Sequence, residues 1–195
     1  MSQALILCAG SSSRMGQPKA LCQLAGQTIL GRIVATLAEV GIQSPQVIVA
    51  APHGNAIAAW LQAQSLSSVQ LRWNLHPEDG MLSSIQCGLA QLSPSHSGTL
   101  LWPVDVPLVK AQTVQRLLDA DPERLVVPTC GDRGGHPVWL PQARFAEVLA
   151  LPRPPSLRAL RQSHLPLRVA VDDPEIMLDL DTPDDLAQAE LRLRR

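Results

Sequence analysis

The feature that most constrains the fold is a repeated alternation of short apolar, β-rich runs with longer segments of helical period. Residues 4–9 form an unbroken apolar run, which predicts a strand buried on both faces of a sheet. Similar runs follow at residues 46–51, 69–73, 99–102 and 125–127. This alternation is typical of layered α/β folds, and 195 residues suit one domain or one domain with a small appendage.

Several expected elements have recognisable ends. Thr28 can cap a helix over residues 29–40, which Gly41 would terminate. Thr182 can cap a helix beginning at Pro183, with two aspartates in its first turn where the helix dipole favours negative charge. The other expected elements are a helix ending near residue 64, helices beginning at Ser83 or Ser84 and around 114–118, and strands at 137–140 and 176–180.

Composition excludes several classes of protein. Sixteen Lys and Arg residues nearly balance 17 Asp and Glu residues, so we expect no basic face for nucleic acid. The apolar runs are far shorter than the roughly 20 residues that cross a bilayer, and no signal-peptide pattern is visible. The four cysteines form no CxxC pair or Cys/His cluster, which disfavours zinc, iron–sulfur and disulfide scaffolds. We therefore expect a cytoplasmic protein with no nucleic-acid or membrane partner.

The segment after the first expected strand, residues 10–19, is rich in Gly and Ser and contains Arg14 and Lys19. Such a loop offers backbone N–H groups and cations to an anion. It fits neither the Walker A pattern nor GxGxxG. From composition alone it is either a phosphate-binding loop or a surface loop with two solvated cations.

Residues 7–19 resemble the LxAGxSxRMGxxK loop of nucleotidyltransferases with a GT-A-like, Rossmann-type fold, and above all the molybdenum cofactor cytidylyltransferases of the MobA-like NTP transferase family. Four further blocks resemble that family in order: residues 74–85 (NPxxxxGMSSSL), 103–109 (PxDMPLV), 135–138 (GHPV) and 178–186 (LDIDTPEDL). Val106 replaces the usual Met, and one extra residue precedes the Gly80 segment. The resemblance implies a single three-layer α/β domain, residues 1–195, with a mostly parallel central sheet.

The resemblance also implies a nucleotide site. The first loop would wrap the triphosphate, with Arg14 and Lys19 stabilising charge on the leaving pyrophosphate, and the Gly80 segment would lie over the base and ribose. The implied nucleotide contacts are Ala9, Gly10, Ser11, Ser12, Ser13, Arg14, Gly16, Lys19, Gly80, Ser83 and Ser84. The two serines can equally be helix N-caps. The run Cys8-Ala9-Gly10 resembles the AAG of cytidylyl-transferring members rather than the LAGG of guanylyl-transferring ones, which favours CTP.

Aspartates in two blocks are candidate metal ligands. Asp105 follows a buried strand, at the edge where open α/β sheets bind ligands, although Asp is also common in turns. The resemblance makes Asp105 a catalytic ligand of Mg²⁺ and Asp181 the second ligand. Asp179 would share a strand face with Asp181, and it ranks lower as a substrate contact because it can instead bond the backbone.

The acceptor side is less defined. His136 is either a structural loop histidine or, by resemblance, a contact to the acceptor. Trp73, Trp102 and Trp139 lie in or beside strands and fit a core better than a pterin platform. Residues 152–156 either shape the acceptor pocket or form a plain linker.

The resemblance implies transfer of CMP from CTP to molybdopterin or molybdenum cofactor, with Mg²⁺ and release of pyrophosphate. An ionised phosphate acceptor needs no strong general base, and none stands out. One alternative is a sister nucleotidyltransferase using GTP or a sugar or isoprenoid phosphate. Another is a non-catalytic nucleotide-binding accessory protein that serves a molybdoenzyme, against which the presence of Lys19, Asp105 and Asp181 argues.

Overall fold

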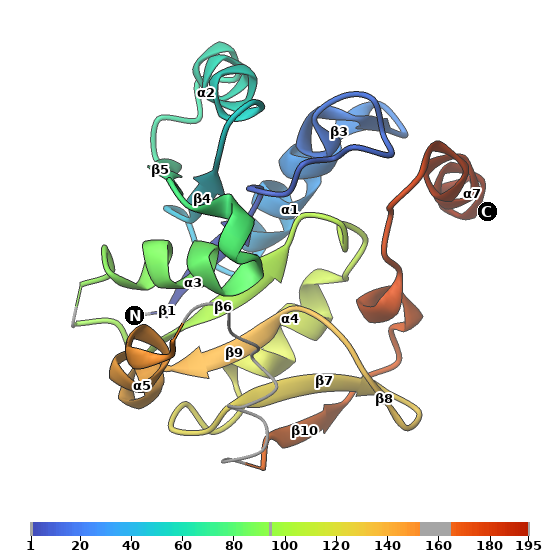
Figure 1. Cartoon of the computed structure of the whole chain (residues 1–195). Helices are drawn as coiled ribbons and strands as arrows, with labels where there is room; N and C mark the ends of the chain where they lie inside the picture. The colour runs from blue at the N-terminus through green and yellow to red at the C-terminus, as the bar shows by residue number, and fades with distance from the viewer. Residues whose placement is uncertain (1, 94, 153–164, 195) are drawn as a thin grey trace.

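A central sheet organises the molecule. The structure is a computed structural model that describes residues 2–93, 95–152 and 165–194. The strands of the sheet are β1 (Ser2–Leu7), β4 (Gln46–Val49), β5 (Gln70–Trp73), β6 (Gly98–Pro103), β7 (Val126–Cys130), β8 (Arg133–Gly134), β9 (Val138–Pro141) and β10 (Leu167–Ala170). Their order is β10-β7-β9-β6-β1-β4-β5, with β8 paired to β7 (Figure 1). β9 runs antiparallel to its neighbours, whereas β10–β7, β6–β1, β1–β4 and β4–β5 pair in parallel, so the expected mostly parallel sheet is confirmed.

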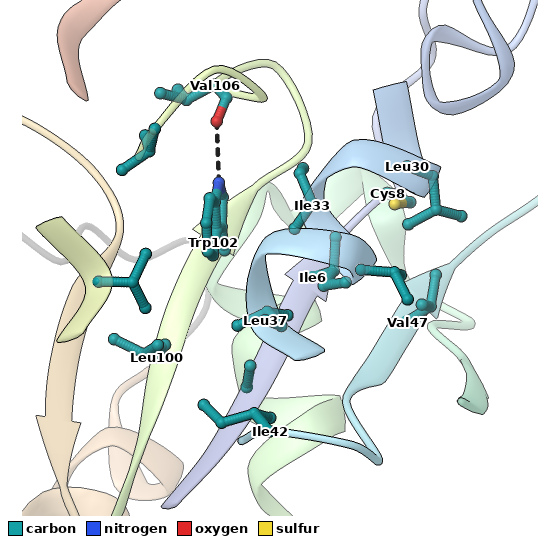
Figure 2. Close-up of a cluster of buried hydrophobic side chains, with 14 of the residues drawn as sticks. Ile6, Cys8, Leu30, Ile33, Leu37, Ile42, Val47, Leu100, Trp102 and Val106 are labelled. Atoms are coloured by element: carbon teal, nitrogen blue, oxygen red, sulfur yellow. Dashed lines mark hydrogen bonds between the residues drawn. The ribbon is translucent and has the colours of Figure 1, made fainter. Parts of the chain in front are cut away.

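Helices cover both faces of this sheet. The helices α1 (Ile29–Glu39), α2 (Gly54–Ala63) and α4 (Ala111–Leu118) share one buried apolar cluster, and α3 (Met81–Leu89) and α5 (Phe145–Ala150) share another. Strand β1 contributes Ala4 and Ile6 to the first cluster and Leu5 and Leu7 to the second. This alternation follows from the two-residue period of a strand and explains why the whole run is apolar. Figure 2 shows Ile6 among the side chains of the first cluster. The predicted three-layer α/β architecture is confirmed.

The capping residues predicted from the sequence mark the starts of some helices but not of others. Thr28 accepts a hydrogen bond from the Gly31 N–H, and Thr182 forms a reciprocal capping box with Asp185, as predicted. The expected start of α3 at Ser83 or Ser84 is wrong, because the helix begins at Met81. Gly80 precedes it at φ +78°, a left-handed conformation that suits glycine, and no side chain caps this end.

The expected strand at 176–180 is also wrong. Residues Pro174–Met177 form the 3₁₀ helix η4, and the Leu180 N–H donates to the Asp105 carbonyl instead of a strand partner. The edge position beside β7 is taken by β10, a strand that is not among those expected from the sequence. Asp179 and Asp181 therefore share no strand face.

The C-terminal helix α7 (Pro183–Leu193) packs beside a segment that follows the first loop. Figure 1 shows it beside the small hairpin of β2 (Gln23–Leu24) and β3 (Gln27–Thr28), where Glu190 accepts a hydrogen bond from the Ala25 N–H. A third apolar cluster joins Met15 and Leu24 to Leu180 and Ala189. This packing brings the C-terminal segment next to the first loop.

Two tryptophans lie in the core as expected, since Trp102 and Trp139 are buried. The same expectation for Trp73 is wrong, because that residue is 41% exposed on the edge strand β5. Of residues 152–156, positions 153–156 lie outside the described part of the chain. No helix in the described ranges is long and apolar enough to span a membrane.

Candidate active site

A cleft of about 220 Å³ opens at the carboxyl ends of β1 and β6, where the turn before α3 forms a further wall. The carboxyl edge of a parallel sheet is where open α/β folds bind ligands. The cleft is lined by Leu7, Cys8, Ala9, Gly10, Ser12, Lys19, Pro77, Gly80, Met81, Ser84, Pro103, Val104 and Asp105. The first loop, the Gly80 segment and the Asp105 segment therefore meet around one space, as predicted.

The first loop folds back on itself to bring Lys19 into the cleft. Ser12 adopts φ +48°, its carbonyl accepts the Met15 N–H at 3.0 Å, and its Oγ accepts the Lys19 N–H at 3.1 Å. The Ser11 carbonyl is held by Nε2 of His53 at 2.9 Å. This loop is therefore a bonded turn over the sheet edge rather than an unconstrained surface segment. Ser11, Ser13 and Gly16 belong to it without lining the cleft.

Four charged side chains meet beside the cleft, of which Lys19 and Asp105 line it and Arg14 and Asp181 do not. Lys19 Nζ lies 2.7 Å from Asp181 Oδ1 and 3.8 Å from Asp105 Oδ2, and an Arg14 guanidinium nitrogen lies 3.2 Å from Asp181 Oδ2. The Lys19 side chain is only 11% exposed. Its hydrogen bond, followed by the charges of Lys19 and Arg14, holds the pKa of Asp181 below its usual value, so Asp181 is ionised near neutral pH.

Asp179 is in the same electrostatic neighbourhood. Partial loss of solvent, followed by repulsion from the Asp105 and Asp181 carboxylates, raises its pKa. Cys8 lies in the lining close to Asp105, and burial together with that negative charge raises the pKa of its thiol. Cys8 therefore stays protonated and is a poor nucleophile.

Three features fix the backbone around Asp105. It follows β6, a strand that is buried along its whole length. The buried indole N–H of Trp102 donates to the Val106 carbonyl at 2.8 Å and closes the turn around Asp105 (Figure 2). The Leu180 N–H donates to the Asp105 carbonyl at 2.8 Å and ties the C-terminal segment to the same turn.

The wall before α3 depends on Asn74, a buried residue that is not among the predicted site residues. Its Nδ2 donates to Ser83 Oγ at 2.8 Å and to Ser84 Oγ at 3.0 Å, and its Oδ1 accepts the His76 N–H at 2.9 Å. Ser83 in turn donates to the Gly80 carbonyl. An amide directly after a strand, and inside one of the matching blocks, was the available signal.

His136 is not brought into the cleft lining. Its side chain is half-buried, and its backbone N–H donates to the Ile176 carbonyl at 2.8 Å. This contact joins the turn before β9 to η4, so the structure places His136 beside the C-terminal segment and leaves its predicted contact with an acceptor untested.

The donor set suits a hard divalent cation. Asp105 and Asp181 converge on one ammonium group, and their carboxylate oxygens are the ligands that Mg²⁺ and Mn²⁺ prefer. Among the residues that the structure describes, no group of three or more His, Cys, Asp or Glu side chains is arranged to hold a metal. Two carboxylates with room for phosphate oxygens and water fit the few protein ligands that Mg²⁺ usually takes.

The site places a bonded Gly/Ser loop, a lysine and two carboxylates at the carboxyl edge of a mostly parallel sheet, which fits the nucleotidyltransferase class that the sequence motifs predict. The chain belongs to the MobA-like NTP transferase family, because the model of the MobA-like NTP transferase domain matches residues 4–169. The family predicted from the sequence motifs is thereby confirmed.

Two relatives that span nearly the whole chain are named for different nucleotides. The chain is 24% identical over 188 residues to the molybdenum cofactor cytidylyltransferase of Escherichia coli K12, covering 96% of this chain and 95% of the relative. It is 29% identical over 211 residues to the molybdenum cofactor guanylyltransferase of Sinorhizobium fredii, covering 98% and 92%.

Among solved structures, the crystal structure of Rv0371c from Mycobacterium tuberculosis H37Rv superposes with a TM-score of 0.82, at 26% identity and 97% coverage of both chains. The manganese complex of that protein superposes with a TM-score of 0.78.

Proposed function

We propose that this protein transfers CMP from CTP to the phosphate of molybdopterin or molybdenum cofactor, with Mg²⁺ and release of pyrophosphate. The observation that carries the proposal is the convergence of Lys19, Asp105 and Asp181 beside the first-loop cleft. The family match and the full-length similarity to a cytidylyltransferase support it. In this proposal residues 1–195 act as one catalytic domain, which would serve a molybdoenzyme downstream.

The chemistry is a displacement at the α-phosphorus of CTP. An oxygen of the acceptor phosphate forms the new bond, and the bond from the α-phosphorus to the oxygen it shares with the β-phosphorus breaks. Pyrophosphate leaves with the electron pair. Because a phosphate monoester is mostly ionised near neutral pH, the acceptor needs no general base. Catalysis then rests on positioning and on neutralising charge.

The charged residues have separate roles in this proposal. Arg14 and Lys19 stabilise the charge that builds on pyrophosphate as the bond breaks. Asp105 and Asp181 would hold the Mg²⁺, which supplies positive charge to the phosphate oxygens when bound. Ala9, Gly10, Ser11, Ser12, Ser13 and Gly16 from the first loop, and Gly80, Ser83 and Ser84 from the α3 wall, contact the nucleotide.

Base preference is assigned to Ala9, which lines the cleft next to the end of β1. A purine extends further than a pyrimidine, and a methyl group at this position narrows the space in surroundings that relax only partly. Backbone groups near Ala9 and Gly80 can pair with the polar edge of cytosine, and a misplaced base would leave them unpaired. We therefore propose CTP as the donor, with GTP as the competing candidate that the guanylyltransferase relative suggests.

The test is a panel of the four nucleoside triphosphates with purified molybdopterin or molybdenum cofactor and Mg²⁺. Pyrophosphate release gives kcat/KM, and mass spectrometry identifies the product. We expect a cytosine dinucleotide and a clear preference for CTP, which Ala9→Gly relaxes without reversing. A wild-type preference for GTP would overturn the base assignment. Tight nucleotide binding without turnover on any phosphate acceptor would support the accessory role instead.

The acceptor contacts are tested with the same assay. His136 and Asp179 are proposed to contact the acceptor, so His136→Ala and Asp179→Asn should raise KM for the cofactor and leave KM for CTP unchanged. If neither KM changes, His136 serves only the joint between the β9 turn and η4 that its backbone already forms.

A further inference from the structure

Both carboxylate oxygens of Asp181 are already occupied by cationic side chains. Oδ1 accepts from Lys19 Nζ at 2.7 Å, and Oδ2 accepts from Arg14 at 3.2 Å. The same ammonium group is 3.8 Å from Asp105 Oδ2. These are the oxygens that a metal bound by Asp105 and Asp181 would need, so the two cations and the metal compete for them.

The competition is strongest at Lys19. Its side chain is 11% exposed, so water screens its charge poorly and offers it few alternative partners. A divalent cation entering beside Asp181 would lose one carboxylate oxygen to this ammonium and would be repelled by its charge. Arg14 is 68% exposed and competes less, because exposed ion pairs are well screened.

We propose that Arg14 and Lys19 exclude a free divalent cation from Asp181 until a triphosphate draws both side chains away. Lys19 lines the cleft and Arg14 belongs to the loop that surrounds it, so phosphate oxygens in the cleft offer both side chains new anionic partners. Metal and triphosphate then bind with positive cooperativity, and by linkage each raises the affinity of the other by the same factor. The triphosphate part rests on the proposed function, whereas the exclusion of free metal concerns the nucleotide-free protein alone.

The exclusion predicts that removing a cation improves metal binding. The experiment titrates the full chain with Mn²⁺ alone, without nucleotide, and measures free Mn²⁺ by electron paramagnetic resonance. We expect Lys19→Met to raise the affinity for free Mn²⁺ about 10-fold, within the usual range of coupling between sites. Arg14→Met should raise it about twofold, as suits an exposed pair.

Lys110 provides a matched control, because it is the only other lysine in the sequence. Its Nζ donates to the Asp172 carbonyl and pairs with neither Asp105 nor Asp181 in the structure. Lys110→Met removes the same charge, so an equal gain in this variant would show a general effect of net charge and overturn the proposal. We expect its Mn²⁺ affinity to match the wild type.

A double variant tests whether the Mn²⁺ gained in Lys19→Met binds at Asp181. Lys19→Met combined with Asp181→Asn should lose the gain, because the freed carboxylate is gone. A Lys19→Met protein that binds Mn²⁺ no better than wild type, or a gain that survives in the double variant, contradicts the proposal. Absence of CMP transfer together with the expected gain would refute the proposed function and leave this inference standing. CMP transfer without the gain in Mn²⁺ affinity would refute this inference and leave the proposed function standing.

Discussion

Asp105 and Asp181 face the same ammonium group but are held there in different ways. Asp105 follows a buried strand, and Trp102 and Leu180 bond the turn that carries it. Asp181 lies in an irregular segment between η4 and α7, where ion pairs and the capping box below it fix its position. The core therefore positions the Asp105 carboxylate, whereas ion pairs and a helix cap position the Asp181 carboxylate.

The difference explains what the sequence could and could not predict. The position of Asp105 is predictable, because the apolar run 99–102 predicts a strand and a parallel strand delivers its next residues to the sheet edge. The predicted strand at 176–180, and with it the shared face of Asp179 and Asp181, is wrong because alternation of Leu and Asp mimics a strand of period two. Only the tertiary contact from Leu180 to Asp105 decides that segment, and no local pattern records it.

The same limit applies elsewhere. The strand β10 alternates Leu167-Arg168-Val169-Ala170 and was predictable, whereas the start of α3 was not. Ser83 looked like a cap, yet Asn74 and the Gly80 carbonyl bind its hydroxyl from across the turn. Short polar side chains serve caps and cleft walls equally well, so their partners are decided by the fold.

The largest expected effect is at the rigid carboxylate. Asp105→Asn should abolish turnover, because an amide is a far poorer Mg²⁺ ligand than a carboxylate and no neighbouring acid on that turn replaces it. Circular dichroism and thermal unfolding should stay near wild type. Pyrophosphate release at ordinary Mg²⁺ concentration is the measurement, and near-normal turnover would refute the metal assignment.

Asp181→Asn is the paired variant on the irregular segment. We expect a smaller loss, since Asp105 remains and Asp179 lies close enough for Asp105 and Asp181 to raise its pKa. Raised Mg²⁺ should recover part of the activity in Asp181→Asn but none in Asp105→Asn. Equal losses of activity in both variants would show that the different ways in which Asp105 and Asp181 are held make no difference to function.

The next effect is at the cation between the carboxylates. Lys19→Ala should lower kcat about 10²–10³-fold, the usual loss for one preorganised group that meets charge in the transition state. Binding of CTP should weaken much less. If only KM for CTP rises, Lys19 holds the triphosphate in the ground state and its role in the transition state is wrong.

A fourth variant weakens the hydrogen bonding around Asp105 without removing a charge. Trp102→Phe leaves the buried Val106 carbonyl unpaired, which should cost about 1–3 kcal/mol of unfolding free energy. The control is Trp139→Phe, which removes an indole N–H bonded to the Pro122 carbonyl, and neither of these residues lines the cleft. Denaturant unfolding should show similar losses, but only Trp102→Phe should raise the Mg²⁺ concentration needed for half-maximal activity. A similar rise in Trp139→Phe would mean that general destabilisation moves Asp105.

The smallest expected effect is at the cap below Asp181. Thr182→Ala should cost about 1 kcal/mol, as the loss of an N-cap usually does, and should lower Tm by about 2–4 °C in a chain of this size. Thr28→Ala removes the cap of α1 and serves as the control, because it should cost a similar amount without changing the Mg²⁺ requirement. Only the Thr182 variant frees the segment that carries Asp181.

The stability lost in Thr182→Ala should depend on pH if the cap includes an interaction with the charged Asp185 carboxylate, and should not if only packing is lost. Hydrogen bonds from the Thr182 hydroxyl and N–H hold the pKa of Asp185 below its usual value. A lowered folded-state pKa contributes stability that is present above the unfolded value of about 4 and is lost as pH falls through the folded value. The deficit of Thr182→Ala, measured by urea unfolding, should therefore be smaller at about pH 3 than at about pH 7. A deficit that is the same at both values would show that the charge of Asp185 contributes nothing to the stability of the cap.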